Sequence, residues 1–294
     1  MIHEYSYRPT AHFGYKGNES HDTTLTFGIE NECDRNGRVT PNMSPSALSD
    51  LLDDASDRIY CKSDSSVSGG LELVTHPGSL AHHMYQLRWK QLLRLCVKAG
   101  YRSHDTRTAG LHVHVGRAQL GTSNEDRDDV IRKLTVLTYR HWDELVVFSR
   151  RRGSELDNWA PRPHISNPDN FDTWEALSEY AYDNIDTYEY DHQRRYTAVN
   201  VTNSDTVELR IFKGTLKRDT LIASLQLTSN MCHYAMEHTW EDIRTCSFLD
   251  VAHYAHFDEL DAYLVVRGLD PDPVTVRRMP DFAGTDGLTP THTA

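Results

Sequence analysis

Three segments of the chain place ionisable side chains two residues apart, and these are the residues whose spacing could support chemistry. The pairs are Glu30 with Glu32, His112 with His114, and Glu208 with Arg210. Apolar residues occupy most of the alternate positions, a period of two that is typical of β-strands with one apolar face. We therefore expect both members of each pair to project from the same face of a strand.

A fourth apolar strand carries Glu72, and a fifth carries Asn200. If these strands share one sheet, a single face bears four carboxylates and two imidazoles. Each close pair of like charges repels by roughly 1 kcal/mol even in water, and more when it is partly desolvated. Divalent cations relieve such repulsion. A carboxylate-rich set with few imidazoles and no cysteine suits Mg²⁺ or Mn²⁺ better than Zn²⁺.

Magnesium held by protein carboxylates usually shares its coordination shell with substrate phosphates. The pattern therefore favours phosphoryl transfer, in which basic side chains stabilise the developing negative charge. The candidates for that task are Lys62, Arg194, Arg195, Arg210 and Lys213. A simpler interpretation stays open for each segment alone, namely that its polar side chains face solvent.

The remaining elements would position this face. Strands are expected at 24–33, 71–75, 110–116, 194–201 and 206–212, and helices at 44–56, 79–99, 124–152, about 173–182, 219–240 and 247–266. The turn at 203–205 joins two strands as a hairpin, which favours an α+β fold with an antiparallel sheet over a doubly wound parallel one. No glycine-rich phosphate-binding motif follows a strand.

The predicted domain organisation is an N-terminal arm (1–23), one catalytic domain (24–268) and a flexible C-terminal tail (269–294). Within the domain, 153–192 is rich in Pro, Asn, Asp and Tyr, as active-site lids and binding loops often are. The arginine run 150–152 ends a predicted helix. It can be explained by helix-end electrostatics or, alternatively, by phosphate binding.

Composition limits the possible partners. The 294 residues carry a formal net charge of −12, which argues against a protein that coats nucleic acid. No apolar run approaches the roughly 20 residues of a membrane span, and no signal peptide is recognisable at the start. The five scattered cysteines lack a C-x-x-C pair. We expect a cytoplasmic protein, for which homo-oligomers are possible.

Five motifs in order carry a resemblance to the amidoligase family, a branch of the glutamine synthetase and glutamate–cysteine ligase superfamily. They are FGIENE (27–32), KSDSS (62–66), LELVT (71–75), AGLHVHV (109–115) and RY-x-x-x-N followed by TVELRIF-x-GTL (195–216). The family implies a curved antiparallel sheet with helices on its convex face, as in the glutamine synthetase catalytic domain. It also implies an ATP- and Mg²⁺-dependent carboxylate–amine ligase that forms an amide through an acyl phosphate.

The resemblance further implies roles for individual residues. Glu30, His112 and Glu208 resemble the ligands of one Mg²⁺ or Mn²⁺ ion, which would bridge ATP phosphates, and Glu32 and Glu72 resemble ligands of a second. Arg210 and Arg195 resemble phosphate-neutralising arginines, while His114 and Asn200 resemble groups on the substrate side. Lys62 and Asp64 match the polar loop, where Asp64 could position the amine or a metal-bound water.

Two departures from the family pattern leave these ligands intact. Asn31 stands where an apolar residue is usual, and Ser65 stands where glycine is usual. The resemblance implies carboxylate and amine substrates, either small molecules or peptides, without naming them.

Two other functions compete with the ligase. A metal-dependent hydrolase could use the same carboxylates to activate water, but it would need no nucleotide and would leave the arginines near Glu208 surplus. A catalytically idle binding or scaffold protein would not require the intact ligand set.

Overall fold

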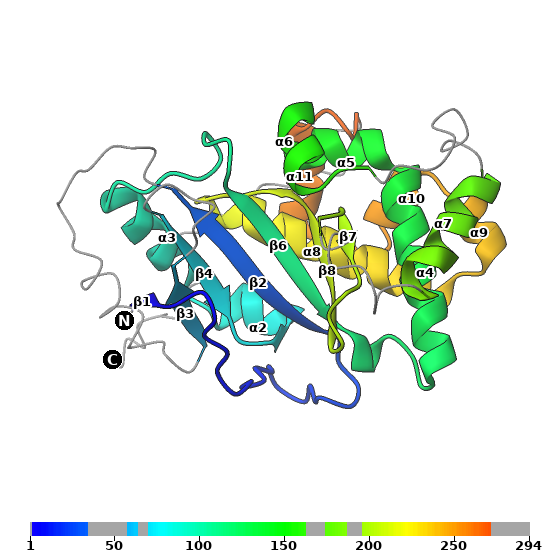
Figure 1. Cartoon of the computed structure of the whole chain (residues 1–294), viewed down its shortest axis with the longest axis horizontal. Coiled ribbons are helices and arrows are strands. Elements are labelled where there is room, and N and C mark those ends of the chain that lie inside the picture. The colour runs from blue at the N-terminus through cyan, green and yellow to red at the C-terminus, as the bar shows by residue number, and fades with distance from the viewer. Residues whose placement is uncertain (1, 35–57, 64–69, 163–173, 187–195, 272–294) are drawn as a thin grey trace, which may run out of the picture.

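The computed structural model describes residues 2–34, 58–63, 70–162, 174–186 and 196–271 (Figure 1). The predicted helix at 44–56, Asp64, Ser65, Arg194 and Arg195 lie outside these ranges, as do residues 272–294 of the predicted tail. None of the described helices is long and apolar enough to cross a membrane.

The described strands form one open, curled sheet, and every pairing in it is antiparallel except the one between β1 and β3. The order is β1-β3-β4-β2-β6-β8-β7, with β5 also paired to β2. The bounds are β1 (Ile2–His3), β2 (Thr26–Cys33), β3 (Ile59–Lys62), β4 (Leu71–Thr75), β5 (Gly78–Ser79), β6 (Gly110–Gly116), β7 (Val199–Asn200) and β8 (Thr206–Lys213). The predicted α+β class is confirmed.

Helices cover the apolar face of this sheet. Phe27, Leu73, Val113 and Leu209 from four neighbouring strands belong to one buried core with residues of the helices, and α8 lies behind the sheet in Figure 1. The helices are α2 (Leu80–Tyr85), α3 (Trp89–Lys98), η1 (Arg117–Gln119), α4 (Asn124–Arg140), α5 (Trp142–Ser149), α6 (Gly153–Trp159), α7 (Trp174–Asp186), α8 (Arg218–Glu237), α9 (Trp240–Thr245), α10 (Phe248–Ala252) and α11 (Asp258–Val266).

Four of the predicted long helices are wrong in extent, and none of their breaks contains a proline. The 79–99 helix divides where Trp89 is buried against His83. The 124–152 helix divides at His141, whose ring packs on Phe248. The 219–240 helix ends at Glu237, and α9 then starts at Trp240.

The predicted helix at 247–266 divides into α10 and α11. The side-chain amide of Asn230 donates to the carbonyl oxygens of Ala252 (2.6 Å) and Ala255 (2.9 Å), so α8 satisfies the backbone of the connecting loop. Ser247 and Asp250 form a capping box at the start of α10. Ser123 and Asp126 form the corresponding capping box at the start of α4.

A β-bulge changes which residues of β8 face the polar side. Val113 pairs with Leu209, but Leu111 pairs with Phe212, so the register shifts between these two positions. The extra residue brings Lys213 opposite Gly110, on the side to which His112 belongs. Strict alternation would have placed Lys213 with Val207 and Leu209 on the apolar side.

The N-terminal arm is tied to the sheet more closely than its sequence suggests. Ile2 and His3 pair in parallel with Cys61 and Lys62 at the edge strand β3. Farther along, Gly14 exchanges backbone hydrogen bonds with the segment that leads into β5, from its own N–H to Pro77 and from the Ser79 N–H to its carbonyl, both 2.9 Å. The arm therefore lies beside the sheet.

All five cysteines are buried and free, in agreement with the absence of a paired cysteine motif.

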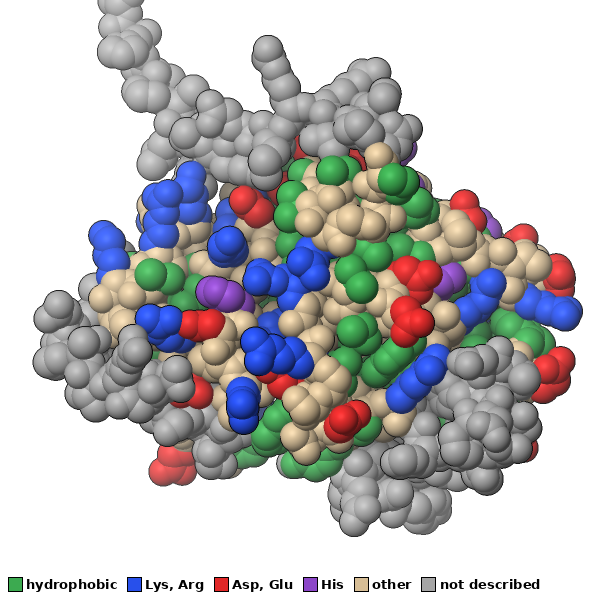
Figure 2. Space-filling view, turned by 90° about the horizontal axis from the view of Figure 1, so that it is seen from above, with side chains coloured by type: hydrophobic (Ala, Val, Ile, Leu, Met, Phe, Trp, Pro, Cys, Tyr) green, Lys and Arg blue, Asp and Glu red, His purple; other side chains and the backbone are tan. Residues whose placement is uncertain are grey.

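Charge is unevenly distributed over the surface. Figure 2 shows lysine and arginine side chains gathered in the middle of one face, although the net charge of the chain is −12.

The side chain of Asn31 connects β2 to the loop after β8, and its removal tests how much this connection stabilises the fold. Its side chain donates to the Thr215 carbonyl (2.9 Å) and accepts from the Thr215 N–H (3.1 Å), fully buried. We expect Asn31→Ala to lower the free energy of unfolding by about 2–4 kcal/mol, because two buried backbone groups lose their partners. Urea denaturation measures this, with the exposed Asn158→Ala as control. Equal stability of the two variants would contradict the assignment.

Candidate functional site

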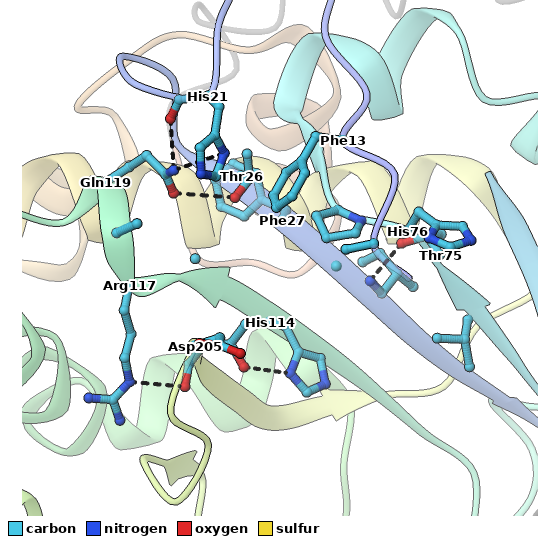
Figure 3. Close-up of a pocket in the computed structure, with 18 of the residues that line it drawn as sticks. Phe13, His21, Thr26, Phe27, Thr75, His76, His114, Arg117, Gln119 and Asp205 are labelled. Atoms are coloured by element: carbon cyan, nitrogen blue, oxygen red, sulfur yellow. Dashed lines mark hydrogen bonds between the residues drawn. The ribbon is translucent and has the colours of Figure 1, made fainter. Parts of the chain in front are cut away.

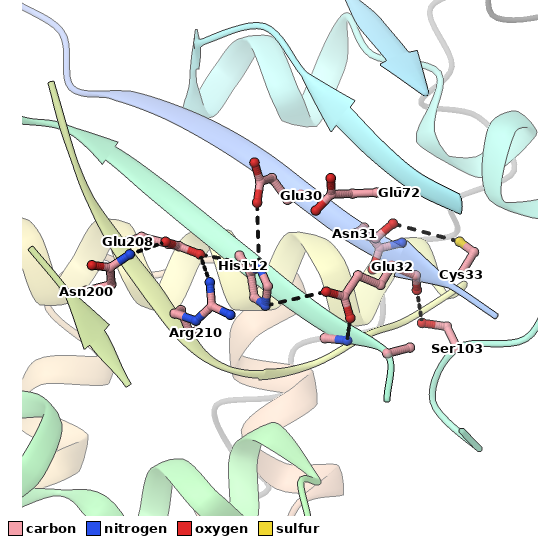
Figure 4. Close-up of polar contacts among 12 residues, drawn as sticks. Glu30, Asn31, Glu32, Cys33, Glu72, Ser103, His112, Asn200, Glu208 and Arg210 are labelled. Atoms are coloured by element: carbon pink, nitrogen blue, oxygen red, sulfur yellow. Dashed lines mark hydrogen bonds and ion pairs between the residues drawn. The ribbon is translucent and has the colours of Figure 1, made fainter. Parts of the chain in front are cut away.

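Cross-strand pairing assembles the predicted site residues on the polar side of the sheet (Figure 4). Glu30 pairs with His112, and Glu32 pairs with Glu72. On the far side of β6, His114 pairs with Glu208. Residues from four strands thus meet because their registers align, although up to 178 positions separate them in sequence.

The first group of possible ligands is Glu30, His112 and Glu208. Nδ1 of His112 lies 3.3 Å from Oε1 of Glu208 and 3.6 Å from Oε2 of Glu30. One ligand atom from each residue lies within 4.8 Å of the others, which is compatible with a shared cation. This is the set that the family resemblance implies for the metal that bridges ATP phosphates.

The second group is Glu32, Glu72 and His112, and it satisfies the same 4.8 Å criterion. Nε2 of His112 lies 4.0 Å from Oε1 of Glu32, so the two ring nitrogens of one imidazole face the two groups. The other oxygen of Glu32 accepts a hydrogen bond from the Gly110 N–H (2.6 Å), which fixes the carboxylate.

Unsatisfied buried atoms support the fit of a cation to these residues. Nδ1 of His112 and Nε2 of His114 are buried and have no hydrogen-bond partner, although both face carboxylates. A divalent cation would satisfy such lone pairs and neutralise the surrounding oxygens. The donor set, four carboxylates with imidazole, suits Mg²⁺ or Mn²⁺.

Neighbouring side chains hold Glu208 in place. Nη1 of Arg210 donates to its Oε1 (2.5 Å), and Nδ2 of Asn200 donates to its Oε2 (2.7 Å). Asn200 is itself fixed, because its Oδ1 accepts from the N–H and the hydroxyl of Thr202. Both predicted residues therefore contact a predicted ligand directly.

The charges perturb one another in a consistent direction. Burial tends to lower the pKa of His114, but the carboxylates of Glu208 and Glu30 outweigh it and raise that pKa to about 9. Burial tends to raise the pKa values of Glu30 and Glu208. The positive charges of His114 and His112 nevertheless hold both pKa values below their ordinary values, and Arg210 contributes to the effect on Glu208. The site is thus an ionised cluster of opposite charges.

Comparison with known proteins identifies the family of the chain. A family profile described as "Putative amidoligase enzyme" matches residues 48–232, more than half of the chain. This chain belongs to the amidoligase family. Among curated proteins, no sequence matches it.

Two solved structures show distant likenesses to this amidoligase. A bifunctional glutathione synthetase from Pasteurella multocida has 12% identity and a TM-score of 0.37, over 86% of this chain and 45% of the synthetase. A novel glutamine synthase homolog has 14% identity and a TM-score of 0.41, over 90% of this chain and 68% of that one. The amidoligase thus spans less than half the length of the glutathione synthetase.

Lys62 and Lys213, the two lysines predicted to stabilise negative charge on ATP phosphates, differ in their surroundings. Nζ of Lys62 lies 3.3 Å from Glu72 and 3.9 Å from Glu30, so it borders both groups of ligands. Lys213 instead donates to Glu155 (2.5 Å) and to the Thr106 carbonyl (2.6 Å). Phosphate binding by Lys213 would require this buried ion pair to open.

Arg151 and Glu155 lie close to the site. For Arg151, phosphate binding by the arginine run was only the alternative interpretation, and Glu155 had no predicted role. Arg151 is buried, donates a hydrogen bond to the Arg210 carbonyl (2.7 Å), and interacts electrostatically with Glu32. Burial lowers its pKa to about 10. Gly110 permits this approach, because a Cβ there would lie 2.5 Å from Nη2 of Arg151. The arginine run was the one indication in the sequence.

A cavity of about 530 Å³ adjoins the ligands (Figure 3). Glu30 and His114 border it on the sheet, and Phe13 and His21 of the N-terminal arm border it opposite. Gln119 links the two sides, because its amide donates to the His21 carbonyl (2.8 Å) while its carbonyl accepts from Thr26 (3.3 Å). The arm therefore forms part of the wall beside the predicted metal ligands.

The raised pKa of His114 predicts a pH dependence for the metal-free protein. Its folded pKa of about 9 exceeds the ordinary 6.5, so its contribution to stability is complete below about pH 6.5 and is lost as pH rises through 9. We expect the free energy of unfolding, measured in urea with a chelator, to fall across this window. In His114→Asn the fall should largely disappear. An undiminished fall in that variant would contradict the assignment, and the exposed His104→Asn is the control.

Proposed function

We propose that this amidoligase is an ATP- and Mg²⁺-dependent carboxylate–amine ligase that acts through an acyl phosphate. The observation that carries the proposal is the pair of ligand groups that share His112, with Arg210 and Lys62 at their borders. Two adjacent cations beside fixed basic side chains suit a reaction in which a phosphoryl group moves between two anions.

Glu30, His112 and Glu208 would hold one cation, and Glu32 and Glu72 would hold the other. When bound, the cations would supply positive charge to the phosphates of ATP and to the substrate carboxylate, which otherwise repel each other. The carboxylates of the protein therefore bind the nucleotide indirectly.

In the first half-reaction, an oxygen of the substrate carboxylate attacks the γ-phosphorus of ATP, and the bond from phosphorus to the ADP oxygen breaks. Arg210 neutralises charge that develops on the phosphoryl oxygens. Its side chain contacts Glu208 in the free protein, so it is already held at the edge of the first ligand group.

In the second half-reaction, the amine attacks the acyl carbon, phosphate leaves, and the amine loses a proton. His114 borders the cavity beside Glu30, where it would position the substrate. Arg195 and Asp64 lie outside the described residues, and their roles in phosphate neutralisation and amine positioning remain predictions.

Removal of single carboxylates tests the site. We expect Glu208→Gln and Glu32→Gln to lower the rate of ADP release at least 100-fold, because each removes a charge from one ligand group. Far-ultraviolet circular dichroism and urea titration should show a folded protein in both cases. The exposed Glu125→Gln is the matched control and should retain full turnover.

Isotope transfer separates the ligase from the hydrolase that uses the same carboxylates. With an ¹⁸O-labelled carboxylate substrate, an acyl phosphate delivers one ¹⁸O atom to the released phosphate. We expect this transfer only when acid, amine, ATP and Mg²⁺ are all present. Cleavage of an amide without nucleotide would contradict the ligase and favour the hydrolase, and inactivity of the wild type with every acid–amine pair and every metal would favour the scaffold.

A further inference from the structure

A second cluster of possible metal ligands lies among the helices, away from the polar face of the sheet. His253 ends α10, His256 lies in the following loop, and Asp261 belongs to the first turn of α11. Both helices pack on α8, which covers the apolar side of the sheet. One ligand atom from each of the three residues lies within 4.8 Å of the others.

The distances suit a small cation between two imidazoles and a carboxylate. Nδ1 of His253 lies 3.3 Å from Oδ1 of Asp261, and Nδ1 of His256 lies 3.4 Å from Oδ2. Metal–ligand bonds of about 2.0–2.1 Å in a tetrahedron place neighbouring ligand atoms about 3.3–3.4 Å apart. The two imidazole–carboxylate distances fall in this range, and all three ligand atoms lie within 4.8 Å of one another.

The partner of His253 fixes which nitrogen faces the cluster. Its Nε2 lies 3.0 Å from Oδ2 of Asp270 and donates a proton to it. In the neutral ring Nδ1 is then a bare lone pair directed at the Asp261 carboxylate. Metal-binding histidines commonly donate their other nitrogen to a carboxylate in this way.

Burial makes the arrangement costly without a cation. The Asp261 side chain is 8% exposed, and its Oδ1 is buried without a hydrogen-bond partner, as is Nδ1 of His253. These two atoms face each other. With a neutral His253 ring, a cation bound between these two atoms would convert the 3.3 Å contact into two coordinate bonds.

The backbone around the cluster is held in advance. Asn230 bonds the carbonyls on both sides of His253, at Ala252 and Ala255, and the ring of Tyr254 stacks on His233. A preformed loop reduces the ordering that metal binding would otherwise require.

We propose that His253, His256 and Asp261 form a Zn²⁺ site distinct from the carboxylate-rich face of the sheet. Two imidazoles with one carboxylate suit Zn²⁺ better than Mg²⁺, whereas the carboxylate-rich ligands on the sheet suit Mg²⁺. Three protein ligands leave a fourth position for water. The cation joins the end of α10 to the start of α11, and Asp270 orients the first ligand.

Zinc titration of the chelator-treated full chain tests the site. The titration uses a Glu208→Gln background, which removes a ligand from the first group on the sheet, and it contains excess Mg²⁺ to compete for the second group. We expect one Zn²⁺ to bind by calorimetry and to raise the melting temperature. His256→Ala should lose this binding, and since His256 is 70% exposed its removal should leave the fold intact. Asp270→Asn should weaken it about 10- to 100-fold.

The exposed His104→Ala is the matched control and should bind Zn²⁺ as before. Co²⁺ gives a second readout, because a tetrahedral site produces intense visible absorption that must disappear in His256→Ala. The proposal is overturned if no Zn²⁺ binds in the Glu208→Gln background. It is equally overturned if His256→Ala keeps the stoichiometry and the Co²⁺ spectrum unchanged, because binding would then lie elsewhere.

Discussion

The repulsion among carboxylates on one face of the sheet is the constraint on which the rest of the structure depends. Glu32, Glu72 and Glu208 are each less than 9% exposed, so water cannot screen their charges effectively. A sheet fixes strand spacing, and the cross-strand pairs cannot move apart without loss of backbone hydrogen bonds. The neighbouring side chains must therefore supply positive charge.

Positively charged side chains of the protein lie beside these carboxylates. Lys62 lies beside Glu72, Arg210 binds Glu208, Arg151 approaches Glu32, and His114 is held protonated to about pH 9 by Glu30 and Glu208. The same electrostatic demand that raises this pKa attracts divalent cations. Bound cations and internal ion pairs therefore both compensate the negative charge of the carboxylates. A bound metal would bring the pKa of His114 nearer to its ordinary value.

The period-two pattern was sufficient to predict the polar face. Glu30, His112 and Glu208 meet because strand parity and an antiparallel sheet leave few alternatives, and the family resemblance grouped these three residues as ligands of one metal. The order of the strands in the sheet was not predicted. The pattern failed at Lys213, since a β-bulge is set by local pairing and not by hydrophobic period. Arg151 and Glu155 were missed because tertiary packing alone carries α5 and α6 to the end of the sheet.

Helix ends were predicted less well than strand faces, for a related reason. The breaks at His141 and after Ala252 contain no proline or glycine, and they depend on distant partners such as Phe248 and Asn230. Local propensity cannot report such contacts. The closeness of the N-terminal arm to the sheet also depends on a distant feature, the free edge of β3, which sequence pattern does not reveal.

Calorimetric titration of ATP into the wild-type chain, with Mg²⁺ and with chelator, tests the central claim most directly. The account predicts binding with Mg²⁺ that is lost in chelator, because the carboxylates repel an uncoordinated triphosphate. Arg210→Met should weaken the Mg²⁺-dependent binding. Equal affinity with and without the cation, or no binding in Mg²⁺ or Mn²⁺, would contradict a metal–nucleotide site on this sheet.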